Sequence, residues 1–313
     1  MRQWATAFGL VVVISSLAAC SSSARSTSST PTTAAPPIPC GAKTTEHYAS
    51  YEGVDPNLNS LDVWRPAAGK DGCSNRPLVV WIHGGGWTEG DKTDYIADKA
   101  RLFTDAGYVF ASVNYRLTDV KLDPPKPAYP VHNQDAADAF SWLVSHAAEL
   151  GVDVSRVAVL GYSAGGGILG AITTDESYLG AHGLKLDSIR CAADIDGEGF
   201  DVPYGATHPN PNVQTTYTNA FGHDPATWKA ASPMTHIAAG KGIPEYFVAA
   251  RGPEGRMHEH NEFIAALRAA GVPVTVFDAQ ALDHETVSAY IGKPGDTTIT
   301  PPLIDFIKKC FTA

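Results

Sequence analysis

Basic residues are scarce in this chain of 313 residues, which has 23 Lys and Arg against 33 Asp and Glu. The formal net charge at pH 7 is −10. Proteins that bind the phosphate backbone of nucleic acids depend on clusters of Lys and Arg. The sequence contains no such cluster, and we therefore expect no nucleic-acid partner.

Long apolar runs are also scarce. One stretch, residues 5–19, follows Arg2 and is shorter than the roughly 20 apolar residues that a membrane-spanning helix needs. Its length and its basic start are typical of a secretory signal. We therefore predict a signal peptide at residues 1–19 and export of the protein.

The end of this stretch, Leu17-Ala18-Ala19-Cys20, resembles the lipobox of bacterial lipoproteins. The resemblance implies lipidation of Cys20 and a lipid anchor on the outer face of the bacterial cell membrane. The alternative is a signal peptide that is cleaved at a small-residue site and releases a soluble secreted protein. Residues 20–39 are mainly Ser, Thr, Ala and Pro, and such a composition predicts a flexible tether because it cannot bury enough apolar surface to fold.

The chain has few cysteines, five in all. Without Cys20, four remain, and an even number in an exported protein indicates two disulfides with three possible pairings. We favour Cys40 with Cys73, which would join the start of the domain to the early sheet, and Cys191 with Cys310, which would join the last helix to a core strand. Buried free thiols are the alternative.

Short β-rich runs alternate with helical patterns from about residue 44 to the end, which is typical of parallel strands joined by crossover helices. We therefore predict an α/β fold for one catalytic domain at residues 40–313. The interval 197–242 lacks a clear strand and is predicted to cross the sheet as a partial lid. The predicted strands are 61–64, 78–82, 108–114, 157–160, 189–194, 245–250 and 274–277. The predicted helices are 94–105, 133–147, 258–270 and 303–310.

A glycine-flanked serine follows the strand predicted at 157–160, in Gly161-Tyr162-Ser163-Ala164-Gly165. Where a strand turns sharply into a helix, glycines on both sides let a serine stand exposed above the sheet. A free serine hydroxyl is a poor nucleophile and needs a base and donors that stabilise an oxyanion. Because Gly-x-Ser-x-Gly also arises by chance, the assignment needs a second motif.

The second motif, His83-Gly84-Gly85-Gly86-Trp87, follows the strand predicted at 78–82. Successive glycines allow backbone N–H groups to face a substrate oxygen that side chains would block. No Lys-Ser or Lys-Thr pair follows these glycines, which argues against a phosphate loop. The predicted oxyanion donors are Gly85, Gly86 and Ala164, and the predicted pocket residues are Trp87 and Tyr162.

With these motifs the chain resembles the α/β-hydrolase superfamily, in particular the hormone-sensitive-lipase-like and carboxylesterase-like esterases and lipases with an HGGG loop. The resemblance covers nearly all of residues 44–313. It implies an α/β-hydrolase fold with a mostly parallel sheet, helices on both faces, and a serine nucleophile that needs no metal and no cofactor. It extends to Val113-Asn114-Tyr115-Arg116-Leu117, Gln134-Asp135-Ala136-Ala137 and Ala231-Ser232-Pro233.

The catalytic residues of this fold follow the order serine, acid, histidine. His284 comes after the last predicted strand, which is the position that the base requires. His258 and His260 are two residues apart on a predicted helix, where side chains diverge, so we expect a solvated face there rather than a metal site.

The catalytic acid departs from the family pattern. The family usually places it in a turn after the strand predicted at 245–250, where this chain has Arg251-Gly252-Pro253-Glu254. Glu254 is the only carboxylate of that turn and is our first choice. The rival is Asp196, because it ends the preceding strand at the edge where open parallel sheets hold their active sites. The lesser alternatives are Asp201, Asp278 and Asp283.

These residues predict a serine hydrolase that cleaves carboxylic esters with short or medium acyl chains through an acyl-enzyme on Ser163. A peptidase or amidase with the same triad, and a non-catalytic surface-binding protein on the same fold, are the alternatives. The expected partners are a small-molecule or lipid ester and, through Cys20, the membrane.

Overall fold

The structure of the protein is a computed structural model that describes residues 38–126 and 128–312. The predicted signal peptide, the lipidation site at Cys20 and residues 20–37 of the predicted tether lie outside the described residues and stay predictions. No helix in the described part of the chain is long and apolar enough to cross a membrane.

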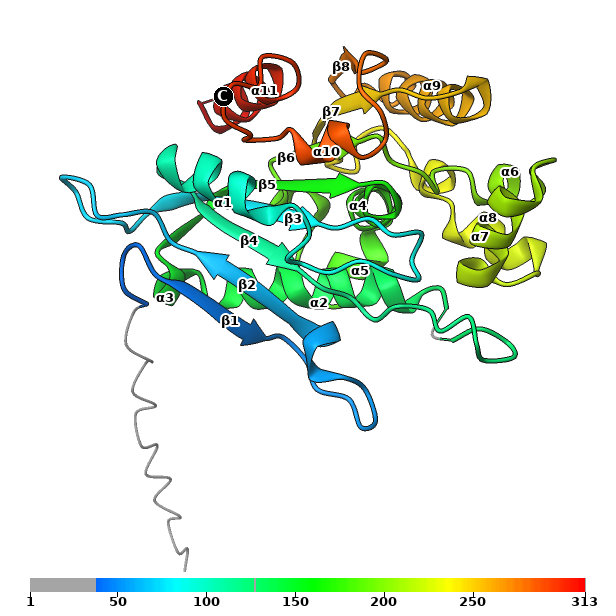
Figure 1. The fold of residues 1–313 in the computed structure, drawn as a ribbon, viewed down its shortest axis with the longest axis horizontal. Coiled ribbons are helices and arrows are strands. Elements are labelled where there is room, and N and C mark those ends of the chain that lie inside the picture. Colours follow the sequence, from blue (N-terminus) through cyan, green and yellow to red (C-terminus); the bar gives the residue numbers. More distant parts are fainter. Residues whose placement is uncertain (1–37, 127, 313) are drawn as a thin grey trace, which may run out of the picture. The chain divides into compact units, whose positions relative to one another are not determined.

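The described residues form an eight-stranded sheet with the strand order β1-β2-β4-β3-β5-β6-β7-β8, as Figure 1 shows. β1 and β2 pair antiparallel, as do β2 and β4, and every other pair is parallel. This topology confirms the predicted α/β fold. The strands are β1 (Lys43–His47), β2 (Ser60–Trp64), β3 (Arg76–Ile82), β4 (Val109–Val113), β5 (Val152–Tyr162), β6 (Cys191–Ile195), β7 (Glu245–Ala250) and β8 (Val274–Asp278).

Helices cover both faces of the sheet because the central strands are apolar on both sides. In β3, Val80 and Ile82 pack on the face that α2, α4, α5 and α9 cover, whereas Val79 and Trp81 pack on the face of α1, α10 and α11. Figure 1 shows α1 and α2 on opposite sides of β3 and β4. The helices are α1 (Ile96–Asp105), α2 (Val131–Ser145), α3 (Ala147–Leu150), α4 (Ala164–Thr174), α5 (Glu176–Gly180), α6 (Val202–Ala206), α7 (Pro211–Phe221), α8 (Pro225–Ala231), α9 (Glu254–Ala269), α10 (Thr286–Ala289) and α11 (Thr300–Thr312), with short 3-10 turns η1 (Pro56–Asn59), η2 (Leu186–Ser188) and η3 (Pro233–His236).

The two favoured disulfides are confirmed, Cys40 with Cys73 and Cys191 with Cys310. The second joins β6 to α11, although the two cysteines are 119 residues apart in the sequence. It therefore ties the last helix to a central strand.

The N–H of Ile38, the first described residue, donates a hydrogen bond to the carbonyl of Glu149 over 3.2 Å. Glu149 lies in α3, directly before β5, and the Ile38 side chain packs against the core. The first described residue is therefore held near the start of β5.

Candidate active site

Ser163 stands in a sharp turn between β5 and α4. Its φ angle is +53°, a left-handed conformation that a non-glycine residue rarely adopts. A side chain at Gly161 would place its Cβ 2.2 Å from the carbonyl oxygen of Gly165, and one at Gly165 would come within 2.4 Å of the carbonyl oxygen of Ile82. Gly161 is therefore required for β5 and α4 to approach this closely, and Gly165 is required for α4 to approach the end of β3.

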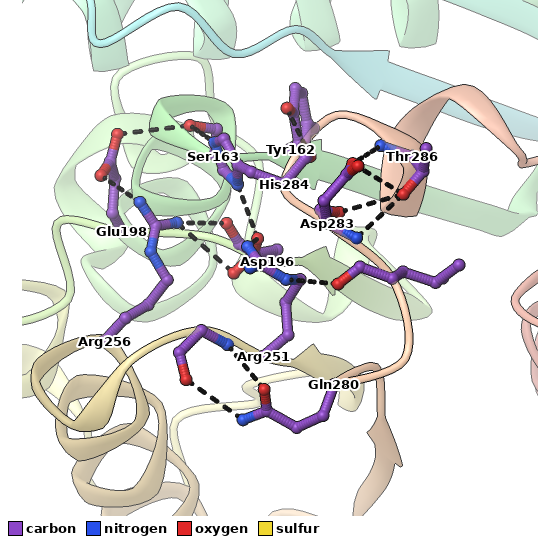
Figure 2. Close-up of polar contacts among 12 residues, drawn as sticks. Tyr162, Ser163, Asp196, Glu198, Arg251, Arg256, Gln280, Asp283, His284 and Thr286 are labelled. Atoms are coloured by element: carbon purple, nitrogen blue, oxygen red, sulfur yellow. Dashed lines mark hydrogen bonds and ion pairs between the residues drawn. The ribbon is translucent and has the colours of Figure 1, made fainter.

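Ser163, His284 and Asp196 form a continuous chain of hydrogen bonds (Figure 2). The distance from Ser163 Oγ to His284 Nε2 is 3.0 Å, and His284 Nδ1 donates to Asp196 Oδ2 over 2.6 Å. The three residues follow β5, β8 and β6, respectively, and so meet at the carboxyl edge of the parallel strands. This is the geometry of a nucleophile, a general base and the carboxylate that orients the base.

This geometry corrects our first choice for the acid, Glu254. Glu254 is exposed at the first position of α9, and no hydrogen bond joins it to His284 in the described structure. Asp196 is fully buried, and its φ of +49° turns the chain at the end of β6. Among the lesser alternatives, Asp201 caps α6 and Asp283 bonds Thr286, whereas Asp278 is an exposed residue at the end of β8.

The carboxylate of Asp196 accepts donors from three side chains. Besides His284, Arg251 Nη1 lies 2.7 Å from Oδ2 and Arg256 Nη1 lies 3.4 Å from Oδ1. Burial favours the neutral acid, but the hydrogen bond from His284 and the charge of Arg256 outweigh it and lower the pKa of Asp196 below its usual value. Asp196 is therefore an anion at neutral pH.

The glycine loop lies directly over the nucleophile. A Cβ at Gly84 would come within 2.8 Å of the Cβ of Ser163, and Gly85 and Gly86 have φ angles of +115° and +56°. In the described part of the chain, the N–H groups of Gly85, Gly86 and Ala164 have no hydrogen-bond acceptor. They are therefore free to bind a substrate oxygen beside Ser163.

A cleft of about 800 Å³ opens at Ser163. Its walls combine the glycine loop, Tyr95 before α1, Ser288 of α10 and one side of α7. Part of the interval 197–242 thus borders the cleft, and its role as a partial lid stays a prediction. The lining side chains from α7 are Asn212, Val213, Thr216, Tyr217 and Asn219.

Glu198 and Arg256, for which no role was predicted from the sequence, also line this cleft. Glu198 Oε1 lies 3.3 Å from Ser163 Oγ, and Glu198 Oε2 lies 3.0 Å from Arg256 Nη2 (Figure 2). A carboxylate beside the nucleophile attracts hydrogen-bond donors, and Arg256 partly neutralises its charge. The string Asp196-Gly197-Glu198-Gly199 after a buried strand was the available signal.

The two predicted pocket aromatics have different positions. Tyr162 lines the cleft and its hydroxyl donates to the carbonyl of His284 over 2.7 Å. Trp87 is buried and packs edge-on against Tyr217 and Phe221, and it is not a lining residue of the cleft. The prediction of a pocket role for Trp87 is therefore wrong, because its indole packs in the core rather than at the surface of the cleft.

The predicted solvated face of α9 is also wrong for His260, although His258 is exposed. His260 is fully buried, with Nε2 3.4 Å from a carboxylate oxygen of the buried Asp194. Between the two histidines, Glu259 accepts N–H hydrogen bonds from the loop that follows Glu198. This face of α9 supports the loop that carries Asp196. Among residues 38–126 and 128–312, no group of three or more His, Cys, Asp or Glu side chains is placed to hold a metal ion.

Comparison with known proteins gives one family and a consistent set of relatives. The model of the BD-FAE family matches residues 61–249. The chain is 27% identical to esterase LipI of Mycobacterium tuberculosis over 227 residues, which cover 70% of this chain and 67% of LipI. It is 43% identical to carboxylesterase NlhH of the same organism over 125 residues, which cover 39% of this chain and only 35% of NlhH.

Among solved structures, a thermophilic esterase from Thermogutta terrifontis superposes with a TM-score of 0.66 and 23% identity. The match covers 88% of this chain and 92% of that esterase. At this identity the likeness shows the fold, which is that of the α/β-hydrolases.

Proposed function

The chain belongs to the BD-FAE family, and from this premise we propose that it is a serine esterase, which hydrolyses carboxylic esters through an acyl-enzyme on Ser163. The observation that carries the proposal is the hydrogen-bonded series Ser163, His284 and Asp196 beneath the glycine loop. The esterase names of the relatives favour ester over amide bonds as the substrate.

In the acylation step, Ser163 Oγ attacks the carbonyl carbon of the ester while its proton passes to His284 Nε2. The carbonyl oxygen becomes an oxyanion, which accepts hydrogen bonds from the N–H groups of Gly85, Gly86 and Ala164. Asp196 stabilises the imidazolium through Nδ1. When the intermediate collapses, the C–O bond breaks and the alcohol oxygen takes the proton from His284.

In the second step, water replaces the alcohol. His284 Nε2 accepts a proton from the water as it attacks the acyl carbon, and the same proton returns to Ser163 Oγ when the acid leaves. Asn212, Thr216 and Asn219 of α7 and Glu198 interrupt the apolar part of the cleft lining, which favours short or medium acyl chains over long alkyl chains that need an extended apolar wall.

Two measurements on the purified protein test this proposal. We expect a fluorophosphonate probe to label the wild type covalently and a p-nitrophenyl ester series to show turnover that falls at long acyl chains. Ser163→Ala should lose labelling and reduce turnover to near background. Folded wild-type protein that neither reacts with the probe nor cleaves any ester of the series would refute the proposal.

We further propose that Cys20 is lipidated and anchors the exported protein to the outer face of the bacterial cell membrane. The proposal rests on the resemblance of residues 17–20 to a lipobox. Partition of the full chain from expressing bacteria into detergent should be lost in Cys20→Ser. Mass spectrometry of the mature N-terminus that finds Cys20 unmodified, or removed, would contradict the anchor.

A further inference from the structure

Two guanidinium groups reach the carboxylate of Asp196 from the segment after β7, and Figure 2 shows both. Arg256 binds the backbone oxygen of Asp196 as well as its side chain, and it also pairs with Glu198. Arg251 binds the oxygen Oδ2, the one that accepts from His284. The two arginines therefore have different tasks at the same acid.

Arg251 also contacts the loop that carries His284. Its Nε donates to the carbonyl of Leu282 over 2.9 Å, two residues before the histidine. Beside this contact, Gly252 N donates to Gln280 Oε1 over 3.3 Å and Gln280 Nε2 donates to Gly252 O over 3.2 Å. The end of β7 is thus joined to the acid on one side and to the histidine loop on the other.

The histidine loop has little apolar packing, which comes from Ala279 and from the partly buried Leu282. Gln280, Ala281, Asp283 and Glu285 are exposed, and only Ala279 at its start is buried. Hydrogen bonds to neighbouring elements therefore help to decide where His284 lies, and they come from Ala250, Gly252, Arg251 and the hydroxyl of Tyr162. Arg251 is the contact that also holds Asp196, with only 16% of its side chain exposed.

We propose that Arg251 is a positioning residue of the esterase, which sets the distance between Asp196 and His284 by binding the carboxylate and the histidine loop at once. This inference rests on the proposed function. Arg251 stands at the end of β7, next to the turn that holds the acid in related hydrolases. In this chain the acid has its place after β6, and the guanidinium bridges the gap between β6 and β8.

The geometry requires arginine rather than any cation. A guanidinium directs Nε and Nη1 in fixed directions and can serve two acceptors at once, whereas a lysine ammonium is a point charge on a flexible stem. Lysine at position 251 keeps the charge near Asp196 but cannot hold Leu282 in the same way. The two substitutions Arg251→Met and Arg251→Lys therefore separate charge from position.

The test compares kcat, KM and the fluorophosphonate labelling rate for wild type, Arg251→Met, Arg251→Lys and the control Arg268→Met, which removes an exposed arginine of α9. We expect Arg251→Met to lower kcat and the labelling rate at least tenfold with KM within about twofold, as for a group that supports the transition state. Arg251→Lys should recover part of the loss, and the control should match wild type.

The inference is overturned if Arg251→Met keeps kcat within twofold of wild type, or if KM and thermal stability change together with kcat. If the methionine variant does not fold, the lysine variant decides: a severalfold loss of kcat at an unchanged thermal midpoint supports the inference, and wild-type kcat overturns it. A wild type that is neither labelled nor active would instead refute the proposed esterase.

Discussion

At the scale of single residues, the candidate site depends on one buried carboxylate that serves three donors. Asp196 binds His284 through the oxygen that Arg251 also contacts, and Arg256 reaches the second oxygen. The neutral amide of asparagine would lose the attraction to all three groups. Glu254, the residue that the family pattern favoured, has an exposed side chain and no contact of this kind in the described structure.

We predict that Asp196→Asn lowers kcat by about three to four orders of magnitude, because the base loses both its orientation and the charge that stabilises its protonated form. Glu254→Gln is the matched control and should stay within twofold of wild type. Steady-state kinetics on p-nitrophenyl acetate measure both. An Asp196→Asn variant that keeps kcat within tenfold of wild type would show that Asp196 is not the acid.

Sequence reasoning could predict the nucleophile and the base because each has a local cause. The glycines around Ser163 are demanded by the turn itself, and His284 follows the last strand. The acid has no such local cause, since its place depends on which strand end reaches His284. Arg251 lies in the turn after β7, which usually carries the acid in the family. Only the folded structure shows that Asp196, after β6, reaches His284 instead.

At the scale of elements, strands with a local apolar pattern could be predicted from the sequence, and a strand that depends on its neighbour could not. The seven predicted strands are mainly apolar, whereas β1 reads Lys-Thr-Thr-Glu-His and lies at the sheet edge, where it pairs with β2. Helices α7 and α8 were missed although both begin with a capping side chain followed by proline, Asn210-Pro211 and Asp224-Pro225. The start of both helices could therefore have been predicted from the capping residue and the proline that follows it.

The disulfides allow a prediction about elements joined far apart in the chain. Cross-links that close longer loops restrict the unfolded chain more, so the loss of Cys191–Cys310 should cost about 5 kcal/mol of unfolding free energy and the loss of Cys40–Cys73 about 4 kcal/mol. Denaturant unfolding of the two paired Cys→Ser variants measures the difference. A larger loss for the shorter loop would contradict the loop-length argument.

At the scale of the whole molecule, stability depends on histidines that are buried in the neutral form. His132 lies on α2 with its Nε2 2.9 Å from Thr118 Oγ1, and burial together with the charge of Arg116 lowers its pKa to about 3. In the unfolded chain the same group has its ordinary value of 6.5. Below pH 6.5 the unfolded chain therefore binds a proton at His132. The folded protein binds this proton only below about pH 3.

We predict that this histidine removes about 1.7 kcal/mol of unfolding free energy between pH 6.5 and pH 5, because the loss approaches about 1.4 kcal/mol for each pH unit once the unfolded histidine is fully protonated. Urea unfolding of wild type and His132→Gln at the two pH values measures it. The glutamine variant, which cannot take up the proton, should lose less stability than wild type by that amount. Parallel losses in the two proteins would rule out His132 as the source.

The contact of Ile38 with α3 has a practical consequence. Ile38 lies near the start of β5, and Ser163 follows the end of the same 11-residue strand, roughly 33 Å further along. A solid support that is coupled to the chain just before Ile38 would therefore be attached at the end of β5 that is remote from the cleft. An enzyme immobilised through that side would have its cleft facing away from the support and open to the substrate solution.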